Sequence, residues 1–522
     1  MTGLKRLAVV DFAVAAALAA VVVVSRLPFV GHILYHWDSI NLALALDRFD
    51  VAADRPQFPG YLLYVVLVRL IQSILPDPQS AMVAISIAGS AIAVVSLFLF
   101  SSVLWNRRVG FFAALMLASS PLFWFYGEIA LPHCLDAAWI VVSVGCLALA
   151  CSGRPGWLLL GAMIVAIAGG FRPQTQLFLM PLAFYAAWQH RWRTAALTAV
   201  VALLIDLAWL LPLLRLSGGL SGYLELMRNY NATYTQMTSV FSAGLPGLMR
   251  NAIKLAMYTA YGWAAGAVPF VVCLAYRPWR TRSAFDRKTI VLLTTWVLPA
   301  LLYYLLLHMG QQGLIFVFLP ALCLLSSLAL EGCSPHWRNR IVGAVVCIGT
   351  ALFLVAPTFP FGTDRAKLLT AQTLREHDRQ WLSRLDAVHA NFKPRSAALV
   401  SSARRFAEYY FPEYRVVDYR LGARWDADEN QPRLRHETTE TMTALGLSAG
   451  DDGFAFLVIL DDDLLPFNRA PQRVEWIRTP KAPPLAFMRF TSSERLQLGA
   501  EGFSFVPTVQ PAAPRPIPES EP

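Results

Sequence analysis

The stretch His36–Tyr64, HWDSINLALALDRFDVAADRPQFPGYLLY, decides how this chain must fold. It follows directly after the first long apolar run, residues 7–25, which is long enough to cross about 30 Å of hydrocarbon as a helix. That run begins like a signal peptide, but it is longer than a usual one and the sequence stays membranous after it, so we interpret it as a retained span. The chain therefore leaves the membrane and at once presents Asp38 and further aspartates beside aromatic residues and prolines.

Long apolar segments dominate the rest of the sequence. The chain is 56% hydrophobic and only 15% charged, whereas an average soluble domain carries about a quarter charged residues. Apolar runs of about 17–25 residues continue as far as residue 356, so we predict an α-helical polytopic membrane protein with about eleven transmembrane helices. They are placed near residues 7–25, 80–104, 109–126, 134–151, 156–170, 174–188, 194–214, 256–276, 288–307, 313–330 and 341–356.

The basic residues decide the orientation of these spans. With the N-terminus inside, the short loops rich in arginine and lysine all fall on the cytoplasmic side, as the positive-inside rule requires. Counting Gly60–Leu75, GYLLYVVLVRLIQSIL, as a further span would move nearly every basic cluster outside. We therefore predict that this segment is an interfacial or re-entrant helix with Arg69 snorkelling, preceded by a second surface helix over residues 39–49 with Asp38 as its N-cap. A second outer loop, residues 215–254, is too long for a structureless connection and is predicted to be a lid or a lipid-facing gate.

The composition turns soluble after Pro357. Residues 1–356 are predicted to form the transmembrane domain, residues 357–507 a small extracytoplasmic α/β domain, and residues 508–522 a disordered, proline-rich tail. The run FLVILDDDLLP places Asp461–Asp463 at a strand end, where a turn is favoured over a metal site. The net charge of +10 sits in the short loops between spans, which indicates membrane orientation and excludes nucleic acid as the expected partner.

Asp38 is the first candidate for chemistry. Aspartate is a favoured N-cap and a helix follows at once, so a structural role explains it on local sequence alone. A carboxylate at the boundary of water and lipid, however, lies beside apolar groups that disfavour its charged form. Such a group can act as a general base. Asp47, Asp50 and Asp54 are better explained as a solvated face.

Three outer junctions between spans carry the other candidates. FYGEIALPHCLDAAW brings Glu128, His133 and Asp136 close in sequence, and capping or hydrogen bonding is favoured over a metal site because the spacing fits no fixed ligand pattern. GGFRPQTQ places Arg172 at membrane depth, where it either pairs with an anion such as a phosphate or snorkels to the outer headgroups. The same choice applies to His308 in LLHMGQQG.

Five pieces of the first 356 residues together resemble a known family. They are HWDSINLALAL, QFPGYLLY, EIALPHCLDAAW, GFRPQTQLFLMPL and HMGQQGLIFVFLPALCLL. The chain resembles the GT-C class of membrane glycosyltransferases, especially the family 39 branch with the protein mannosyltransferases and the aminoarabinose–lipid A transferases. The pattern departs from the family at QFPGY, where many relatives have His-Pro-Pro, so Gln57 removes a candidate metal ligand.

The resemblance implies a GT-C-like fold and a role for several residues. Asp38 matches the first-loop carboxylate that acts as base or orients the acceptor, and Asp136 matches the second acidic position. Arg172 matches the basic residue that meets the donor phosphate, with His308 and Lys254 as its helpers. The site-lining residues would be Glu128, His133, Asp136, Gln57, Tyr61 and Gln311. No cofactor is required by this set, although a divalent cation, Mg²⁺ or Mn²⁺, is compatible with it.

Such an enzyme would move a sugar onto an acceptor hydroxyl at the outer face of the membrane. Because nucleotide sugars are not expected there, the donor would be a polyprenyl-phosphate sugar that arrives through the membrane lipid, and the acceptor a glycan, a lipid or a protein. Direct displacement would invert the anomeric centre. The rival hypothesis is a transporter or flippase of a lipid-linked sugar, which would predict inverted repeats and broken helices near the midplane. The composition, rich in arginine and alanine, indicates a bacterial cytoplasmic (inner) membrane, with the N-terminus in the cytoplasm and the α/β domain outside.

Overall fold

The computed structural model describes residues 6–236, 238–276, 286–355, 368–419, 438–450, 453–479, 482–499 and 501–508. Contacts divide the chain into two compact units, Met1–Asp378 and Arg379–Pro522, and the division falls inside helix α17 (Ala371–Asn391). The predicted domain boundary at residues 356 and 357 lies outside the described residues, as does the predicted tail beyond Thr508. The proposed limits of the domains therefore stay predictions.

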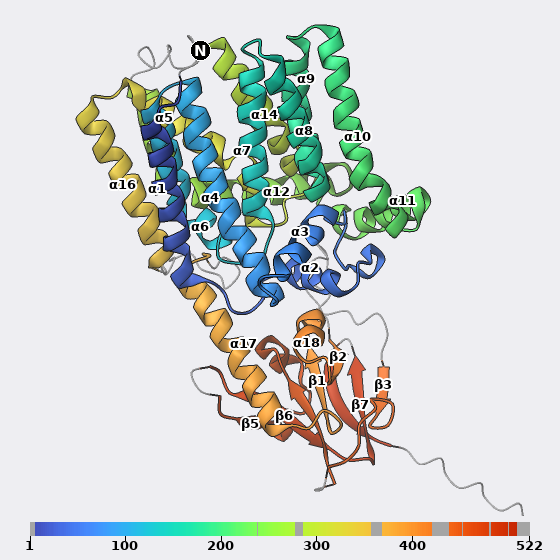
Figure 1. Cartoon of the computed structure of the whole chain (residues 1–522). Coiled ribbons are helices and arrows are strands. Elements are labelled where there is room, and N and C mark those ends of the chain that lie inside the picture. Colours follow the sequence, from blue (N-terminus) through green and yellow to red (C-terminus); the bar gives the residue numbers. More distant parts are fainter. Residues whose placement is uncertain are drawn as a thin grey trace, which may run out of the picture. The chain divides into compact units, whose positions relative to one another are not determined.

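Helices build the first unit (Figure 1). They are α1 (Val9–Arg26), α2 (Trp37–Asp47), α3 (Leu62–Gln72), α4 (Pro78–Leu104), α5 (Arg107–Ala118), α6 (Pro121–Tyr126), α7 (His133–Ala150), α8 (Pro155–Phe171), α9 (Pro173–Trp188), α10 (Trp192–Leu216), α11 (Gly219–Tyr230), α12 (Val240–Trp263), α13 (Ala267–Tyr276), α14 (Arg287–Leu306), α15 (Leu319–Ala329) and α16 (Pro335–Leu354).

Six of the described helices are long and apolar enough to cross a membrane. They are α1 with the turn after it (Val9–Phe29), α4, α7, α10, α14 and α16, and shorter apolar helices cover Leu62–Gln72, Pro155–Phe171 and Leu319–Gly332. The prediction of a helical polytopic membrane protein is therefore confirmed.

Some predicted spans are not single α-helices. The span over residues 109–126 breaks between α5 and α6, because Pro121 starts a new helix and the Ser120 hydroxyl accepts a hydrogen bond from the amide of Phe123. The span over residues 313–330 begins as a 3₁₀ turn, Gln312–Val317, before α15. Hydrophobicity alone does not register such breaks, since the apolar character runs through them.

Helix α7 forms the centre of this unit, since 89% of its most apolar 18-residue window is buried. It packs closely against α4: a Cβ added at Gly89 would lie 2.5 Å from the backbone nitrogen of Leu135, so only glycine permits this approach. The Ser86 hydroxyl on α4 lies 2.8 Å from the carbonyl oxygen of Ile129 and 2.9 Å from that of Leu131. Together these contacts fix the loop before α7 and the first turn of that helix, which carries His133 and Asp136.

The first loop contains two short helices, α2 and α3, as predicted (Figure 1). One detail of that prediction was wrong. The N-cap of α2 is His36, whose Nδ1 accepts a hydrogen bond of 3.1 Å from the amide of Asp38, so Asp38 lies inside the first turn. The exposed Arg69 donates hydrogen bonds of 2.9 and 3.0 Å to the carbonyl oxygens of Ala45 and Leu46, at the end of α2, and its snorkelling stays a prediction. A cation that satisfies the last carbonyls of a helix stabilises its C-terminus.

Replacing Arg69 by alanine is therefore expected to loosen α2. A cation at a helix C-terminus contributes about 1 kcal/mol, so amide exchange in α2 should become about fivefold faster by hydrogen–deuterium exchange. Arg48→Ala is the matched control, because this neighbouring arginine bonds Asp50 at 3.1 Å and is 75% exposed. Equal exchange in both variants would show that Arg69 does not hold the end of α2.

The predicted lid, residues 215–254, is helical and packs on the first loop. The Tyr223 hydroxyl on α11 donates a hydrogen bond of 3.2 Å to the carbonyl oxygen of Pro59. The ring of Phe58 lies 5.3 Å from that of Tyr223 and 5.2 Å from that of Tyr230. The amphipathic α11 thus covers the segment Pro59–Tyr61. That the loop of residues 215–254 acts as a gate stays a prediction.

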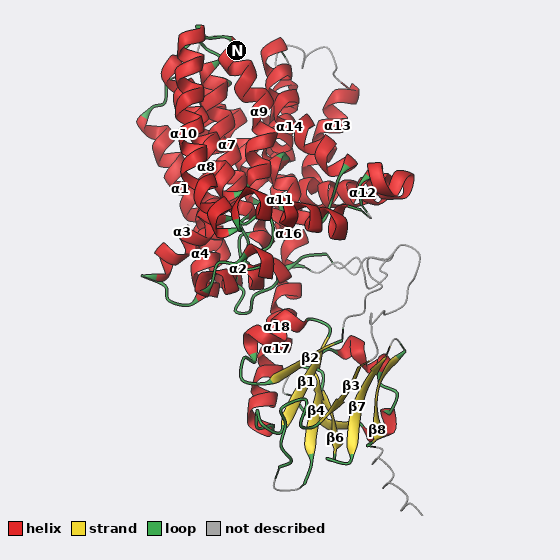
Figure 2. Ribbon diagram, turned by 90° about the vertical axis from the view of Figure 1, so that its right-hand side faces the viewer, coloured by secondary structure: helices red, strands yellow, loops and turns green. Residues whose placement is uncertain are grey.

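The second unit contains two sheets (Figure 2). The first has the order β2-β1-β4-β6-β5, from β1 (Ala397–Ser401), β2 (Arg415–Asp418), β4 (Ala455–Ile459), β5 (Glu475–Ile477) and β6 (Leu485–Phe490). The sequence segments AALVSS, YRVVDYRL, FAFLVIL, RVEWIRT and LAFMRFTS predict these five strands, and residues 366–385 and ARRFAEYYF predict the helices α17 and α18 (Arg404–Tyr410). The antiparallel sheet of β3 (Thr438–Thr441), β7 (Glu494–Gly499) and β8 (Gly502–Pro507) was missed. Asp461 accepts hydrogen bonds from the Ser401 hydroxyl (2.6 Å) and the Ser402 amide (2.8 Å), as expected of a strand-end turn.

Candidate active site

A hydrogen-bonded chain joins Asp38 to the first turn of α7. The Gln311 amide nitrogen donates a hydrogen bond to the Asp38 carboxylate, and the Gln311 carbonyl oxygen lies 2.9 Å from His133 Nε2. Because a carbonyl oxygen only accepts, His133 must carry its proton on Nε2. His36 Nδ1 lies 3.7 Å from the same carboxylate, whose side chain is 22% exposed. Asp38 is therefore oriented by Gln311, is freed from capping and stays accessible.

Asp136 and Arg172 form a second, buried group. Arg172 Nη1 lies 2.8 Å from Asp136 Oδ2, and the two side chains are 7% and 6% exposed. The Thr175 hydroxyl donates to the other oxygen of the same carboxylate. Arg172 lies between α8 and α9 with an extended backbone, as Pro173 after it requires. It does not snorkel to the headgroups, because its partner is an internal carboxylate.

Tyr61 feels the charges of both groups. Burial raises the pKa of Tyr61 to about 12, and the charges of Arg172, Asp38 and Asp136 all act on its hydroxyl. Tyr61 caps α3 with a left-handed backbone, φ 42°, directly after Gly60 at φ 112°. The phenol therefore stays protonated at neutral pH and remains a hydrogen-bond donor.

A basic cluster, which we define as Arg250, Lys254 and His308, joins α12 to the loop after α14. His308 Nδ1 lies 3.0 Å from the Thr238 hydroxyl. Burial, with the charges of Arg250 and Lys254, lowers the pKa of His308 to about 4. Burial and the Arg250 charge lower the pKa of Lys254 to about 8. Two cationic side chains, Arg250 and Lys254, thus act on a neutral His308, and such a concentration of positive charge is typical of a site for an anion.

Asn251 ties this cluster to the segment that carries Gln311. Its amide nitrogen donates a hydrogen bond of 2.8 Å to the carbonyl oxygen of Thr238, and its carbonyl oxygen accepts one of 3.2 Å from the amide of Met309. The segment His308–Gln311 therefore connects the basic cluster to Asp38.

Two predicted site residues take other positions. Glu128 is fully buried, and burial raises its pKa against the opposing charge of Arg26. No interaction found for Glu128 joins it to Asp38 or Asp136 among the described residues. The main-chain carbonyl oxygen of Gln57 accepts a hydrogen bond of 3.0 Å from the Gly60 amide, so this residue closes the turn before Tyr61.

Sequence reasoning missed several residues near the site. Arg250 had a usable signal, since it precedes Lys254 by four positions and thus shares its helix face. Tyr230 and Tyr304 had none: the charge of Asp38 acts on Tyr230, and those of Arg172 and Asp136 act on Tyr304. Only the packing of α11 and α14 brings these tyrosines to the site.

A divalent cation finds little support in this donor set. Gln311 presents its amide nitrogen, a donor, to Asp38, and Gln57 stands where a ligand would be needed. Within the described ranges, no group of three or more His, Cys, Asp and Glu side chains is arranged to hold a metal ion. We derive no step that uses a metal.

Comparisons with known proteins support the predicted resemblance. Residues 54–215 match the family of dolichyl-phosphate-mannose-protein mannosyltransferases. A search of curated proteins found no match. The fold is similar to that of ArnT from Cupriavidus metallidurans bound to undecaprenyl phosphate, with a TM-score of 0.58 and 12% identity over 92% of this chain and 98% of that one. The apo state of the same enzyme gives a TM-score of 0.54 and 13% identity over 92% and 97% of the two chains.

The family match includes Tyr61, Asp136 and Arg172 and begins after Asp38, whereas the shared fold extends over 92% of the chain. The resemblance predicted from the sequence is therefore confirmed, and so is the class of enzyme. Residues 54–215 thus resemble the dolichyl-phosphate-mannose-protein mannosyltransferases, and the chain has a fold like that of the membrane enzyme ArnT.

Proposed function

We propose that the protein transfers a sugar from a polyprenyl phosphate to an acceptor hydroxyl at the outer face of a bacterial inner membrane. Asp38 is the base. The observation that carries this proposal is the hydrogen bond from Gln311 to Asp38, because it orients an accessible carboxylate. The segment His308–Gln311 links this carboxylate to the basic cluster, so a base and an anion site lie at the two ends of one short segment.

The reaction is a single displacement. The acceptor oxygen gives its proton to Asp38 and forms a bond to the anomeric carbon, while the bond from that carbon to the phosphate oxygen breaks. The leaving group is polyprenyl phosphate, and the anomeric centre inverts. A positioned base typically contributes about 10²–10⁴ in rate.

The donor phosphate binds the basic cluster, with His308 and Lys254 in the roles predicted from the sequence and Arg250 added. We assign Arg172 a different role, because its guanidinium already pairs with Asp136 at 2.8 Å. It holds the Asp136 carboxylate in place at the start of α7, and so helps to shape the acceptor side of the site.

The orientation is part of this proposal. Helical segments lie at the positions of the predicted spans, six of them long and apolar enough to cross a membrane, which supports it. We place α2 and α3 at the outer membrane surface, in the first loop. With a cytoplasmic N-terminus, the start of α7 and the ends of α8 and α14 face outward, where the site lies. The α/β domain would then be extracytoplasmic.

The direct test is the release of free polyprenyl phosphate from a panel of polyprenyl-phosphate sugars. Membranes that contain candidate acceptors are compared with wild-type protein and with Asp38→Asn. Release that depends on Asp38 supports the proposal and identifies the donor. Movement of intact lipid-linked sugar across vesicles without release would favour the flippase.

Donor affinity is expected to fall at alkaline pH. Lys254 has a pKa lowered to about 8 in the free protein, and a bound phosphate raises that pKa because it favours the charged ammonium. Affinity for polyprenyl phosphate should therefore be flat below about pH 7 and fall by up to about tenfold per pH unit above pH 8. Binding measured by titration over pH 6–10 checks this.

Lys254→Arg is the matched variant for this profile, since arginine keeps its charge throughout. Its binding should stay flat to pH 10. The same alkaline loss in both proteins would show that Lys254 does not meet the phosphate.

A further inference from the structure

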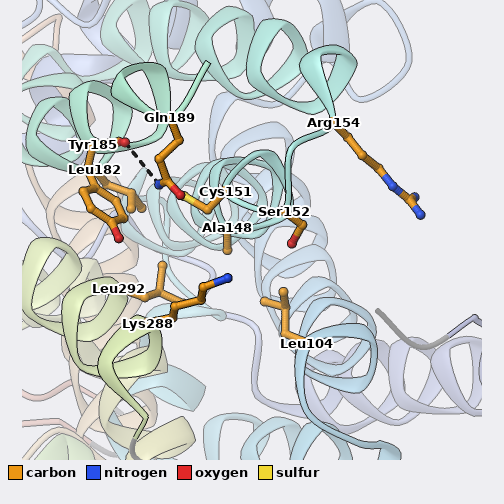
Figure 3. Close-up of a pocket in the computed structure, with 10 residues that line it drawn as sticks. All are labelled: Leu104, Ala148, Cys151, Ser152, Arg154, Leu182, Tyr185, Gln189, Lys288 and Leu292. Atoms are coloured by element: carbon orange, nitrogen blue, oxygen red, sulfur yellow. Dashed lines mark hydrogen bonds between the residues drawn. The ribbon is translucent and has the colours of Figure 1, made fainter. Parts of the chain in front are cut away.

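A cavity of about 350 Å³ lies at the other end of the helical unit (Figure 3). Two helices locate it. Helix α7 begins with His133 and lines the cavity with Ala148 near its end, while α9 begins after Arg172 and is followed by Gln189. Since a helix rises 1.5 Å per residue, the 18 residues of α7 separate the cavity from the candidate active site by about 27 Å.

Its polar lining suits an anion. Lys288, at the start of α14, points its ammonium toward the other lining side chains, and Tyr185, Gln189 and Ser152 contribute neutral polar groups (Figure 3). None of the described residues that line the cavity is acidic. Arg154 points away from the others and adds positive charge at the rim (Figure 3).

The remaining lining is apolar, from Leu104, Ala148, Leu182 and Leu292. A cavity of this volume falls within the range of small-molecule sites, about 300–1,000 Å³. The cavity lies at the ends of membrane helices, and its lining has two parts. The polar donors suit the charged headgroup of a phospholipid, and the leucines suit its acyl chain.

We infer that this cavity is a phosphate-binding site, separate from the catalytic one, for the headgroup of an anionic phospholipid in the cytoplasmic leaflet. The leaflet follows from the orientation under the proposed function, whereas the site itself does not depend on it. Lys288 binds the phosphate by charge, and the leucines contact the start of the acyl chain.

The test uses the full-length protein in phosphatidylcholine nanodiscs, with binding of added phosphatidylglycerol measured by titration. A basic residue near anionic lipid contributes about 1 kcal/mol, so Lys288→Gln should bind about fivefold more weakly than wild type. Ser152→Trp, at an exposed position, should block the cavity and give a similar loss. Arg193→Gln, which removes the same charge outside the cavity, should bind like wild type.

A second arm separates the two sources of phosphate. In this arm, inorganic phosphate competes with the lipid. If it displaces the lipid only from proteins with an intact cavity, the cavity is a phosphate site whose ligand is a soluble phosphate. Equal binding of phosphatidylglycerol by wild type, Lys288→Gln and Ser152→Trp would overturn the inference. None of these outcomes depends on transferase activity, so a failure here is distinct from a failure of the proposed reaction.

Discussion

Asp38→Asn is expected to lower kcat by about 10²–10⁴-fold, the usual contribution of a positioned base, and to leave the Kd of the donor unchanged. Asparagine keeps an oxygen that can accept the hydrogen bond from Gln311, so the geometry of the site should survive. What is lost is the group that removes the acceptor proton. The measurement is single-turnover release of polyprenyl phosphate, with donor binding titrated in parallel.

Asp47→Asn is the matched control for this variant. Asp47 is the last residue of the same helix α2 and is exposed, so its loss should leave kcat intact. A weaker Kd with unchanged kcat in Asp38→Asn would instead place this carboxylate in donor binding. Similar losses in both variants would mean that disturbance of α2, and not loss of a base, explains the effect.

Asp38 also shows how far sequence reasoning reaches. Its place after the first span, at the head of a short apolar helix, was enough to select it as a candidate. Local sequence could not choose between a cap and a base, because both use an aspartate at a helix start. The structure decides the capping question, since His36 takes that position.

The partners of the selected residues were less predictable than the residues themselves. Gln311 lies 273 positions from Asp38, and no local pattern encodes a contact over that distance. The helices were predicted from hydrophobic length, which is a local property. The missed sheet joins β3 to β7 across more than fifty residues, and no local pattern links two strands over that distance.

Arg172→Met is expected to destabilise the protein by about 3–5 kcal/mol, because it leaves the Asp136 carboxylate buried without its cation. The two side chains are only 7% and 6% exposed, so water cannot replace the lost partner. The double variant Arg172→Met with Asp136→Leu removes both charges and should recover most of this loss. Reversible unfolding in mixed micelles measures all three proteins.

Arg48→Met is the comparison that isolates burial. Arg48 pairs with Asp50 at 3.1 Å, but its side chain is 75% exposed, so its loss should cost about 0–1 kcal/mol. If Arg172 binds the donor phosphate, as predicted from the sequence, its loss should weaken donor binding and leave stability unchanged. If Arg172→Met folded as stably as wild type but bound the donor more weakly, the guanidinium would be a donor ligand. If Arg172→Met instead lost much stability and the added Asp136→Leu restored it, the Arg172–Asp136 pair would be a structural support of the site. Removal of the second charge can rescue the first variant only if the two charges are partners inside the protein.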